Sequence, residues 1–119
     1  MRCFVFVILL LSPLSTFAEG VPRVVIAVYD SVTDPDISST QLHQMAEMPL
    51  NHLGLVLEYT DIRNSLPPLR GREDVLGVIS WFREEMMMSH EEVERYLSWA
   101  IAAVTAGKKY FIFGNPGFR

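Results

Sequence analysis

The chain has 119 residues, enough for one small domain, and half of its residues are hydrophobic. Its net charge of −4 argues against a nucleic-acid partner, because proteins that bind nucleic acids normally carry a basic surface. The same charge disfavours adsorption to anionic lipid headgroups. The single cysteine, Cys3, excludes an internal disulfide and a cysteine metal cluster.

Residues 1–18 are typical of a secretory signal peptide. Arg2 gives a positive start, residues 3–11 are all apolar, and the small residues Thr16 and Ala18 favour cleavage before Glu19. The apolar run is too short to span a bilayer, which takes about 20 such residues. The sequence therefore predicts an exported protein, periplasmic or secreted, with no membrane segment after cleavage. Residues 19–119 would form the mature domain, which contains no cysteine.

The first predicted elements are a strand and a helix. Residues 23–29 form a continuous apolar run rich in β-branched residues, as expected for a strand buried on both faces of a sheet. Ser38 is the expected N-cap of the helix, and Gln41 would complete a capping box. Pro49 predicts a kink or a restart of this helix, and Gly54 ends it. Its core face is predicted to hold Leu42, Met45, Ala46, Leu50 and Leu53.

Three further strands and one long helix complete the predicted order. Residues 55–60 and 75–82 are predicted strands separated by a polar connection. Ser89 is the expected N-cap of the long helix, with Glu92 completing a capping box. Residues 110–113 are the last predicted strand. The core face of the long helix is predicted to hold Val93, Tyr96, Leu97, Ala100, Ile101 and Val104.

This order, β-α-β-loop-β-α-β, predicts an α/β fold with a three-layer parallel sheet. Right-handed crossovers favour the flavodoxin-like strand order 2-1-3-4. The strand at 110–113 would then be an unpaired apolar edge, which favours association. A flavodoxin-like domain usually has a fifth strand and a final helix. We therefore expect this chain to be part of a larger domain, or its edge to be covered by a companion domain or subunit.

Ligands of open α/β sheets bind beyond the carboxyl ends of the strands, near the point where the strand order reverses. Trp81, beside Arg83 and Glu84, is suited to stack on a sugar ring and to form hydrogen bonds with it. A simpler interpretation is that Trp81 and Phe82 cap the core. The candidate ligand-binding residues at this rim are Asp30, Asp61, Arg63, Trp81, Arg83, Glu84 and Asn115.

Three chemistries that are common on this fold lack their residues here. A phosphoacceptor domain needs an aspartate at the end of the third strand, where residues 80–82 are Ser-Trp-Phe. A flavin phosphate would be repelled by Asp30, Asp34 and Asp36 in the first loop. Amidotransferase chemistry needs a cysteine nucleophile, which the mature chain lacks. The sequence thus predicts no catalytic residue and no cofactor.

Metal ligands are also weakly represented. His43 with Glu47, and His90 with Glu94, are spaced to share a helix face, but neither pair has a third ligand nearby. Such pairs are more typical of solvated helix surfaces. The methionines at 86–88 with His90 allow a copper-chaperone interpretation, although methionine is also an ordinary core residue. We expect no metal site.

Three segments resemble the class I glutamine amidotransferase-like superfamily: Asp74–Phe82, Met88–Tyr96 and Ala106–Gly114. Its non-catalytic members show the same succession of strand, capped helix, Ala-Gly, strand and Gly. The stretch Met48–Arg63, with Leu66 and Pro67 beyond it, is similar to the amidotransferase-like region of exported bacterial exopolysaccharide hydrolase/deacetylase proteins of the Pel kind. Together these matches cover about residues 23–116.

The resemblance implies a periplasmic polysaccharide setting and no activity of its own. The amidotransferase cysteine would follow the last strand, where this chain has Gly-Asn-Pro-Gly at 114–117. The predicted function is a non-catalytic module that positions glycan or docks a partner. The predicted partner is a polysaccharide, or a companion domain or subunit covering the Tyr110–Phe113 edge. The alternative is a glycan hydrolase with Asp61 and Glu84 as its two carboxylates.

Overall fold

The computed structural model describes residues 20–118, so the predicted signal peptide and its cleavage site lie outside the described residues. All four strands within this range pair in parallel in a single sheet, in the order β2-β1-β3-β4. The predicted α/β fold and strand order 2-1-3-4 are therefore confirmed. The strands are β1 (Val24–Tyr29), β2 (Val56–Asp61), β3 (Val75–Phe82) and β4 (Lys109–Gly114).

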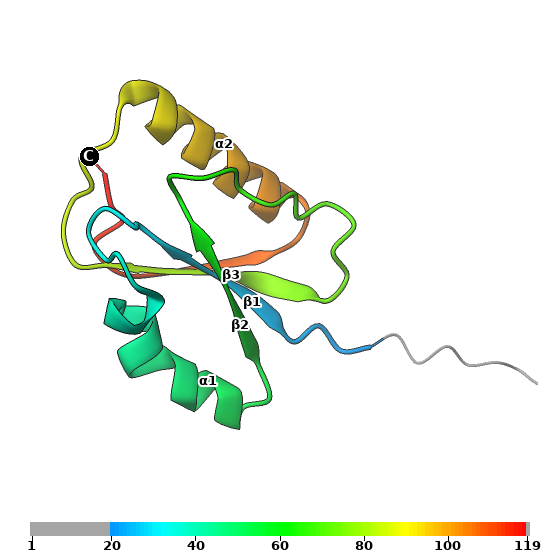
Figure 1. Cartoon of the computed structure of the whole chain (residues 1–119). Helices are drawn as coiled ribbons and strands as arrows, with labels where there is room; N and C mark the ends of the chain where they lie inside the picture. Colours follow the sequence, from blue (N-terminus) through cyan, green and yellow to red (C-terminus); the bar gives the residue numbers. More distant parts are fainter. Residues whose placement is uncertain (1–19, 119) are drawn as a thin grey trace, which may run out of the picture.

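Helices cover opposite faces of the sheet (Figure 1). The crossover from β1 to β2 contains a short 3-10 turn, η1 (Ile37–Ser39), a π-helical turn, η2 (Leu42–Ala46), and α1 (Glu47–His52). The crossover from β3 to β4 contains α2 (His90–Thr105) on the other face. This placement gives the three layers that the sequence predicts.

The core has two halves, one on each face of the sheet, because successive strand side chains point to opposite faces. Ile26 of β1 and Val78 of β3 pack on the α2 side, with Tyr96 of α2 and Ile62. Ala27 and Ile79 pack on the α1 side with Leu42. β1 is buried from Val25 to Val28, which confirms that it lies inside the sheet.

The first crossover helix begins differently from the prediction. Asp36 caps the 3-10 turn by accepting from the Ser38 amide, and Thr40 Oγ1 accepts from the His43 amide at 3.1 Å. The predicted capping box of Ser38 and Gln41 is therefore wrong. The helix restarts at Glu47, which places Pro49 in the first turn of α1, where its missing amide proton costs no hydrogen bond.

The core face predicted for this helix is only partly correct. Leu42 is buried, and Ala46 and Leu50 pack against the same cluster. Met45 and Leu53 are exposed instead, because the π-helical turn and the short α1 break the regular helical spacing on which the prediction relied.

The long helix begins as predicted. Ser89 accepts from the Glu92 amide, and the Glu92 carboxylate accepts from the Ser89 amide at 2.7 Å, so the capping box is confirmed. Its predicted core face is partly wrong, because the residues that meet the sheet are centred on Tyr96 and Ala103, with Trp99 packed beside them. Three predicted core residues are exposed: Leu97, Ile101 and Val104.

Replacing Ser89 with alanine should lower the free energy of unfolding by about 1 kcal/mol, because the Glu92 amide loses its cap. Chemical denaturation monitored by circular dichroism measures this. Ser98→Ala is the matched control, since Ser98 is exposed in the middle of the same helix and alanine favours helix there. A Ser89 variant as stable as the Ser98 variant would contradict the capping role.

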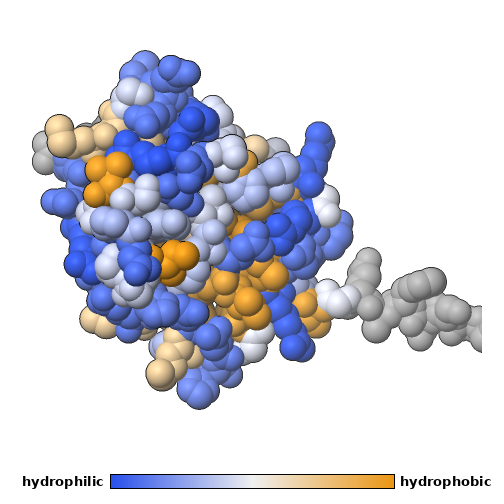
Figure 2. Space-filling model, in the orientation of Figure 1, coloured by the Kyte–Doolittle hydropathy of each residue, from blue (hydrophilic) through white to orange (hydrophobic). Residues whose placement is uncertain are grey.

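The surface of the domain carries both hydrophobic and hydrophilic residues. On the side seen in Figure 2, hydrophobic residues gather in separate patches among hydrophilic ones. None of the helices within residues 20–118 combines the length and the hydrophobicity that crossing a bilayer requires.

Candidate functional site

Asp30 lies at the carboxyl end of β1, and its side chain is 1% exposed. Arg63, which follows β2, donates Nε–H to Oδ1 at 2.7 Å and Nη2–H to Oδ2 at 2.9 Å. The Val32 amide and the Thr33 hydroxyl donate to the same carboxylate. Burial raises the pKa of Asp30, but the hydrogen bonds from Arg63, Val32 and Thr33 outweigh it and hold the pKa below its ordinary value.

Arg63 also joins this strand end to α2. Its Nη1 donates to the Met87 carbonyl at 3.1 Å and lies 3.4 Å from Glu92 Oε1. The hydrogen bonds to Asp30 raise the pKa of Arg63 further above its usual range. The guanidinium therefore links the end of β1, the loop before α2 and the first turn of α2.

Asp61, at the end of β2, has both carboxylate oxygens engaged. Oδ1 accepts from the amides of Ser31 and Arg63 at 3.2 and 3.0 Å, and Oδ2 accepts from Asn64 Nδ2 at 3.1 Å. The structure thus brings Asp30, Asp61 and Arg63 together at one rim. Their polar atoms are bonded to one another and to the backbone, which holds the loops in place.

Arg83 and Glu84 lie in the loop after β3. The Arg83 guanidinium donates to the Ser39 carbonyl, and its Nε lies 3.8 Å from Asp34 Oδ1. Arg83 therefore ties this loop to the one after β1. Glu84 is exposed.

Trp81 and Asn115 lie at the end of the sheet nearest β4. The Trp81 ring stacks on Phe113 with centroids 5.3 Å apart, and it also packs against the core on the α1 side. Asn115 Oδ1 accepts from the Gly117 amide at 2.8 Å, and Asn115 forms an isolated bridge with Phe82. Asn115 therefore holds the turn after β4, and Trp81 is in part a core residue.

The two histidine–glutamate pairs contact each other within their helices. His43 Nδ1 lies 2.5 Å from Glu47 Oε2, and His90 Nε2 lies 3.1 Å from Glu94 Oε1. Tyr59 also donates to Glu47. In the described part of the chain, no group of three potential ligands surrounds either pair.

Several exposed apolar residues gather along β4 and the helix beside it. Within residues 20–118 this strand pairs with β3 alone, and apolar residues extend from both of its faces. Ile112 is 56% exposed on the α2 side, while Phe111 and Phe113 are 45% and 46% exposed on the α1 side. We call the free edge of β4 and its exposed apolar neighbours the β4 surface. Those neighbours are Leu97, Ile101, Val104, Phe111, Ile112 and Phe113.

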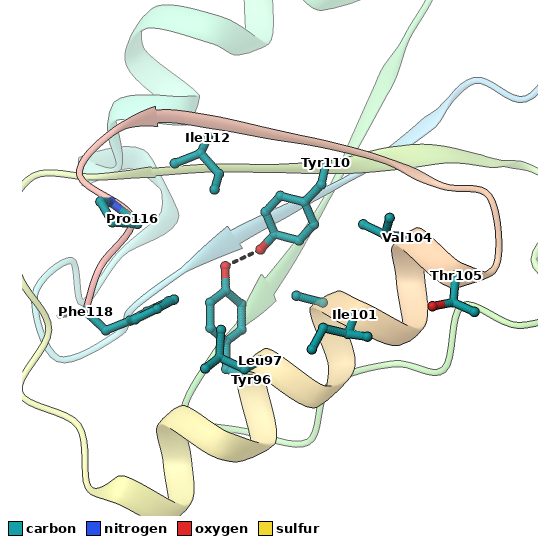
Figure 3. Close-up of a pocket in the computed structure, with 10 residues that line it drawn as sticks. Tyr96, Leu97, Ile101, Val104, Thr105, Tyr110, Ile112, Pro116 and Phe118 are labelled. Atoms are coloured by element: carbon teal, nitrogen blue, oxygen red, sulfur yellow. Dashed lines mark hydrogen bonds between the residues drawn. The ribbon is translucent and has the colours of Figure 1, made fainter.

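A groove of about 350 Å³ runs between α2 and β4 within this surface (Figure 3). Ile101 and Val104 of α2 form one wall, and Ile112 forms the other. The hydroxyls of Tyr96 and Tyr110 point toward each other and are hydrogen-bonded. Burial raises the pKa of both tyrosines, so both hydroxyls stay protonated at neutral pH. The groove is therefore apolar and uncharged.

Sequence reasoning found the β4 edge but missed the helical half of this surface. It placed Leu97, Ile101 and Val104 in the core because their helical spacing continues that of Tyr96. The spacing itself carried no signal of this exposure, because apolar residues three and four positions apart are the ordinary pattern of a helix that packs on a core.

In comparisons with known proteins, no family model, curated protein or solved structure matches this chain. The resemblance to the amidotransferase-like superfamily therefore stays a prediction from sequence motifs.

Proposed function

We propose that this chain is an exported, non-catalytic docking module of exopolysaccharide processing, and that the β4 surface receives a folded partner. One observation carries the docking role: among residues 20–118, β4 has no second neighbouring strand, although residues on both of its faces are apolar. Strands with apolar residues on both faces are typical of the inside of parallel sheets. The signal-peptide pattern supports export, and the motif resemblance supports a role in exopolysaccharide processing.

Docking is favoured over glycan positioning because polar side chains at the rim are already hydrogen-bonded within the protein. A sugar site needs free donors and acceptors beside an aromatic ring. At the rim, the side chains of Asp30, Asp61 and Arg63 are already bonded to each other or to the backbone. The β4 surface instead offers unpaired strand edge and apolar side chains, which are the features that a protein partner covers.

Replacing Ile112 with lysine in the organism that carries this gene should reduce extracellular polysaccharide as strongly as deleting the gene, because a buried charge would block docking. Val56→Lys is the matched control. Val56 is also β-branched, is also 56% exposed, and lies on β2, the opposite edge of the sheet.

The intact mass of the purified protein tests cleavage before Glu19.

Two results would contradict the proposal in different ways. Unchanged polysaccharide in the deletion strain would remove the exopolysaccharide setting. Full polysaccharide production with stable, exported Ile112→Lys protein would remove docking through β4.

A further inference from the structure

The edge of β4 lacks the features that normally keep edge strands apart. Natural proteins protect exposed edges with lysines, prolines or bulges. In β4, Lys109 at the first position is the one charged residue, the next four residues are apolar, and Pro116 lies beyond the end of the strand. The middle of the edge is therefore open to pairing with another strand.

We propose that the occupant of the β4 surface is a second copy of this chain. The two β4 strands would pair antiparallel. The two-fold axis would be normal to the sheet and would pass between Ile112 of one copy and Ile112 of the other. This inference rests on the proposed docking function and names its partner. The result is one continuous sheet of eight strands, four from each copy.

The exposed side chains of β4 are self-complementary in this arrangement. Residues directly opposite each other in antiparallel strands point to the same face. Ile112 then lies opposite Ile112 of the second copy on the α2 side, and Phe111 lies opposite Phe113 of the second copy on the α1 side. The apolar area on each face thus continues across the axis.

The two α2 helices would lie on the same face, one on each side of the paired strands. Strands are about 4.8 Å apart, and packed helices are about 8–10 Å apart. The exposed residues Leu97, Ile101 and Val104 extend beyond the part of α2 that packs on the core, toward the β4 edge. They would therefore face their counterparts across the axis and fill the two grooves.

Charge selects the direction and register of pairing. A parallel pair would place the two Lys109 ammonium groups side by side, whereas antiparallel pairing separates them to opposite ends of the interface. With the axis at Ile112, Lys109 lies just past Gly114, the last residue of β4 in the second copy, where the chain turns away and leaves the ammonium group in solvent. With the axis at Phe111, it would lie opposite the apolar Phe113.

The exposed apolar area is of the size that a dimer needs. If a large apolar side chain has about 200 Å² of surface, the six side chains of the β4 surface expose roughly 600 Å² per copy. A stable interface buries about 800 Å² per partner, and the backbone of the strand edge adds to the side-chain area.

Sedimentation velocity of the exported, purified protein, from micromolar to hundreds of micromolar, tests this proposal. We expect a reversible dimer. Ile112→Lys should raise its dissociation constant at least about 100-fold, because two lysines would meet at the axis. Val56→Lys should leave the constant essentially unchanged. A monomer at every concentration, or dissociation by Val56→Lys, would overturn the second copy as occupant.

Cysteine cross-linking tests the axis independently of variant stability. Because the mature chain has no cysteine, Ile112→Cys provides a single thiol, and opposite residues of paired strands lie within disulfide reach. Oxidation should give a covalent dimer with Ile112→Cys and none with Val56→Cys. A dimer that Ile112→Cys does not cross-link would overturn this register. A monomer whose Ile112→Lys variant still loses polysaccharide production would overturn the dimer and leave the docking function standing.

Discussion

Replacing Arg63 with methionine is expected to lower the free energy of unfolding by about 3 kcal/mol at neutral pH. Methionine keeps much of the side-chain volume but leaves the Asp30 carboxylate, which is 1% exposed, without its cation. A buried charge that loses its partner is among the most destabilising changes in a protein. Urea denaturation of wild type and variant measures the difference.

The stability difference between wild type and Arg63→Met should also depend on pH, in a direction that the charge of Asp30 sets. In the wild type the pKa of Asp30 is lowered, so its contribution to stability is present above the unfolded-state pKa and is lost as pH falls through the folded-state pKa. Without Arg63, burial dominates and should raise that pKa. The variant then gains stability relative to wild type as pH falls from 7 to about 4. A difference that widens on acidification would contradict this account.

Two control variants separate the buried pair from ordinary surface charge. Arg72 binds Glu58 and Asp74 through a similar set of hydrogen bonds, but these groups are largely in solvent, so Arg72→Met should change stability little. The double variant Asp30→Asn, Arg63→Met should be more stable than Arg63→Met alone, because it removes the unpaired charge. Equal stability of the single and double variants would show that Arg63 acts through packing instead.

Replacing Gly77 with alanine is expected to destabilise the protein by about 3 kcal/mol and to loosen β4 from the sheet. Gly77 of β3 lies opposite Lys109, and a Cβ there would overlap the Lys109 carbonyl, with the carbonyl carbon only 3.0 Å away. The backbone of β4 would have to move away, which breaks strand pairing.

Hydrogen exchange can localise this effect. In Gly77→Ala, amides of β4 should exchange faster, while those of β1 and β2 change less, because β1 and β2 pair with each other independently of β4. Gly20→Ala is the control for a general glycine effect, since a Cβ at Gly20 meets nothing within 4 Å. Unchanged exchange in β4 would contradict the close approach of the two strands.

Much of the fold could be predicted because its determinants are local. The apolar runs of β1 and β3, and the Ser89–Glu92 capping box, are readable in short segments, and right-handed crossovers then fix the strand order. The details of η2 could not be read in this way. Thr40 replaces Ser38 as the helix cap because the preceding 3-10 turn uses Ser38, and this turn depends on Asp36.

The candidate site was harder to predict than the fold. Asp30 and Asp61 end adjacent parallel strands, so their proximity follows from strand order. That Arg63 would neutralise Asp30 depends on the path of a loop, which sequence periodicity does not specify. The exposure of Ile101 and Val104 depends on how many strands lie beneath α2. Helical spacing reports that a face is apolar, but not whether anything covers it.

The pairing of strands in this sheet also affects how fast the protein folds. The partners of β1, which are β2 and β3, come later in the chain, and every pair of neighbouring strands joins residues more than thirty positions apart. Such long-range pairing is intrinsically slow, because chain entropy is lost before contacts form. A newly made chain therefore stays extended for longer than one with hairpin connections. Slow folding of this kind is compatible with the export proposed above, because a chain that is still unfolded can pass through a narrow translocation pore.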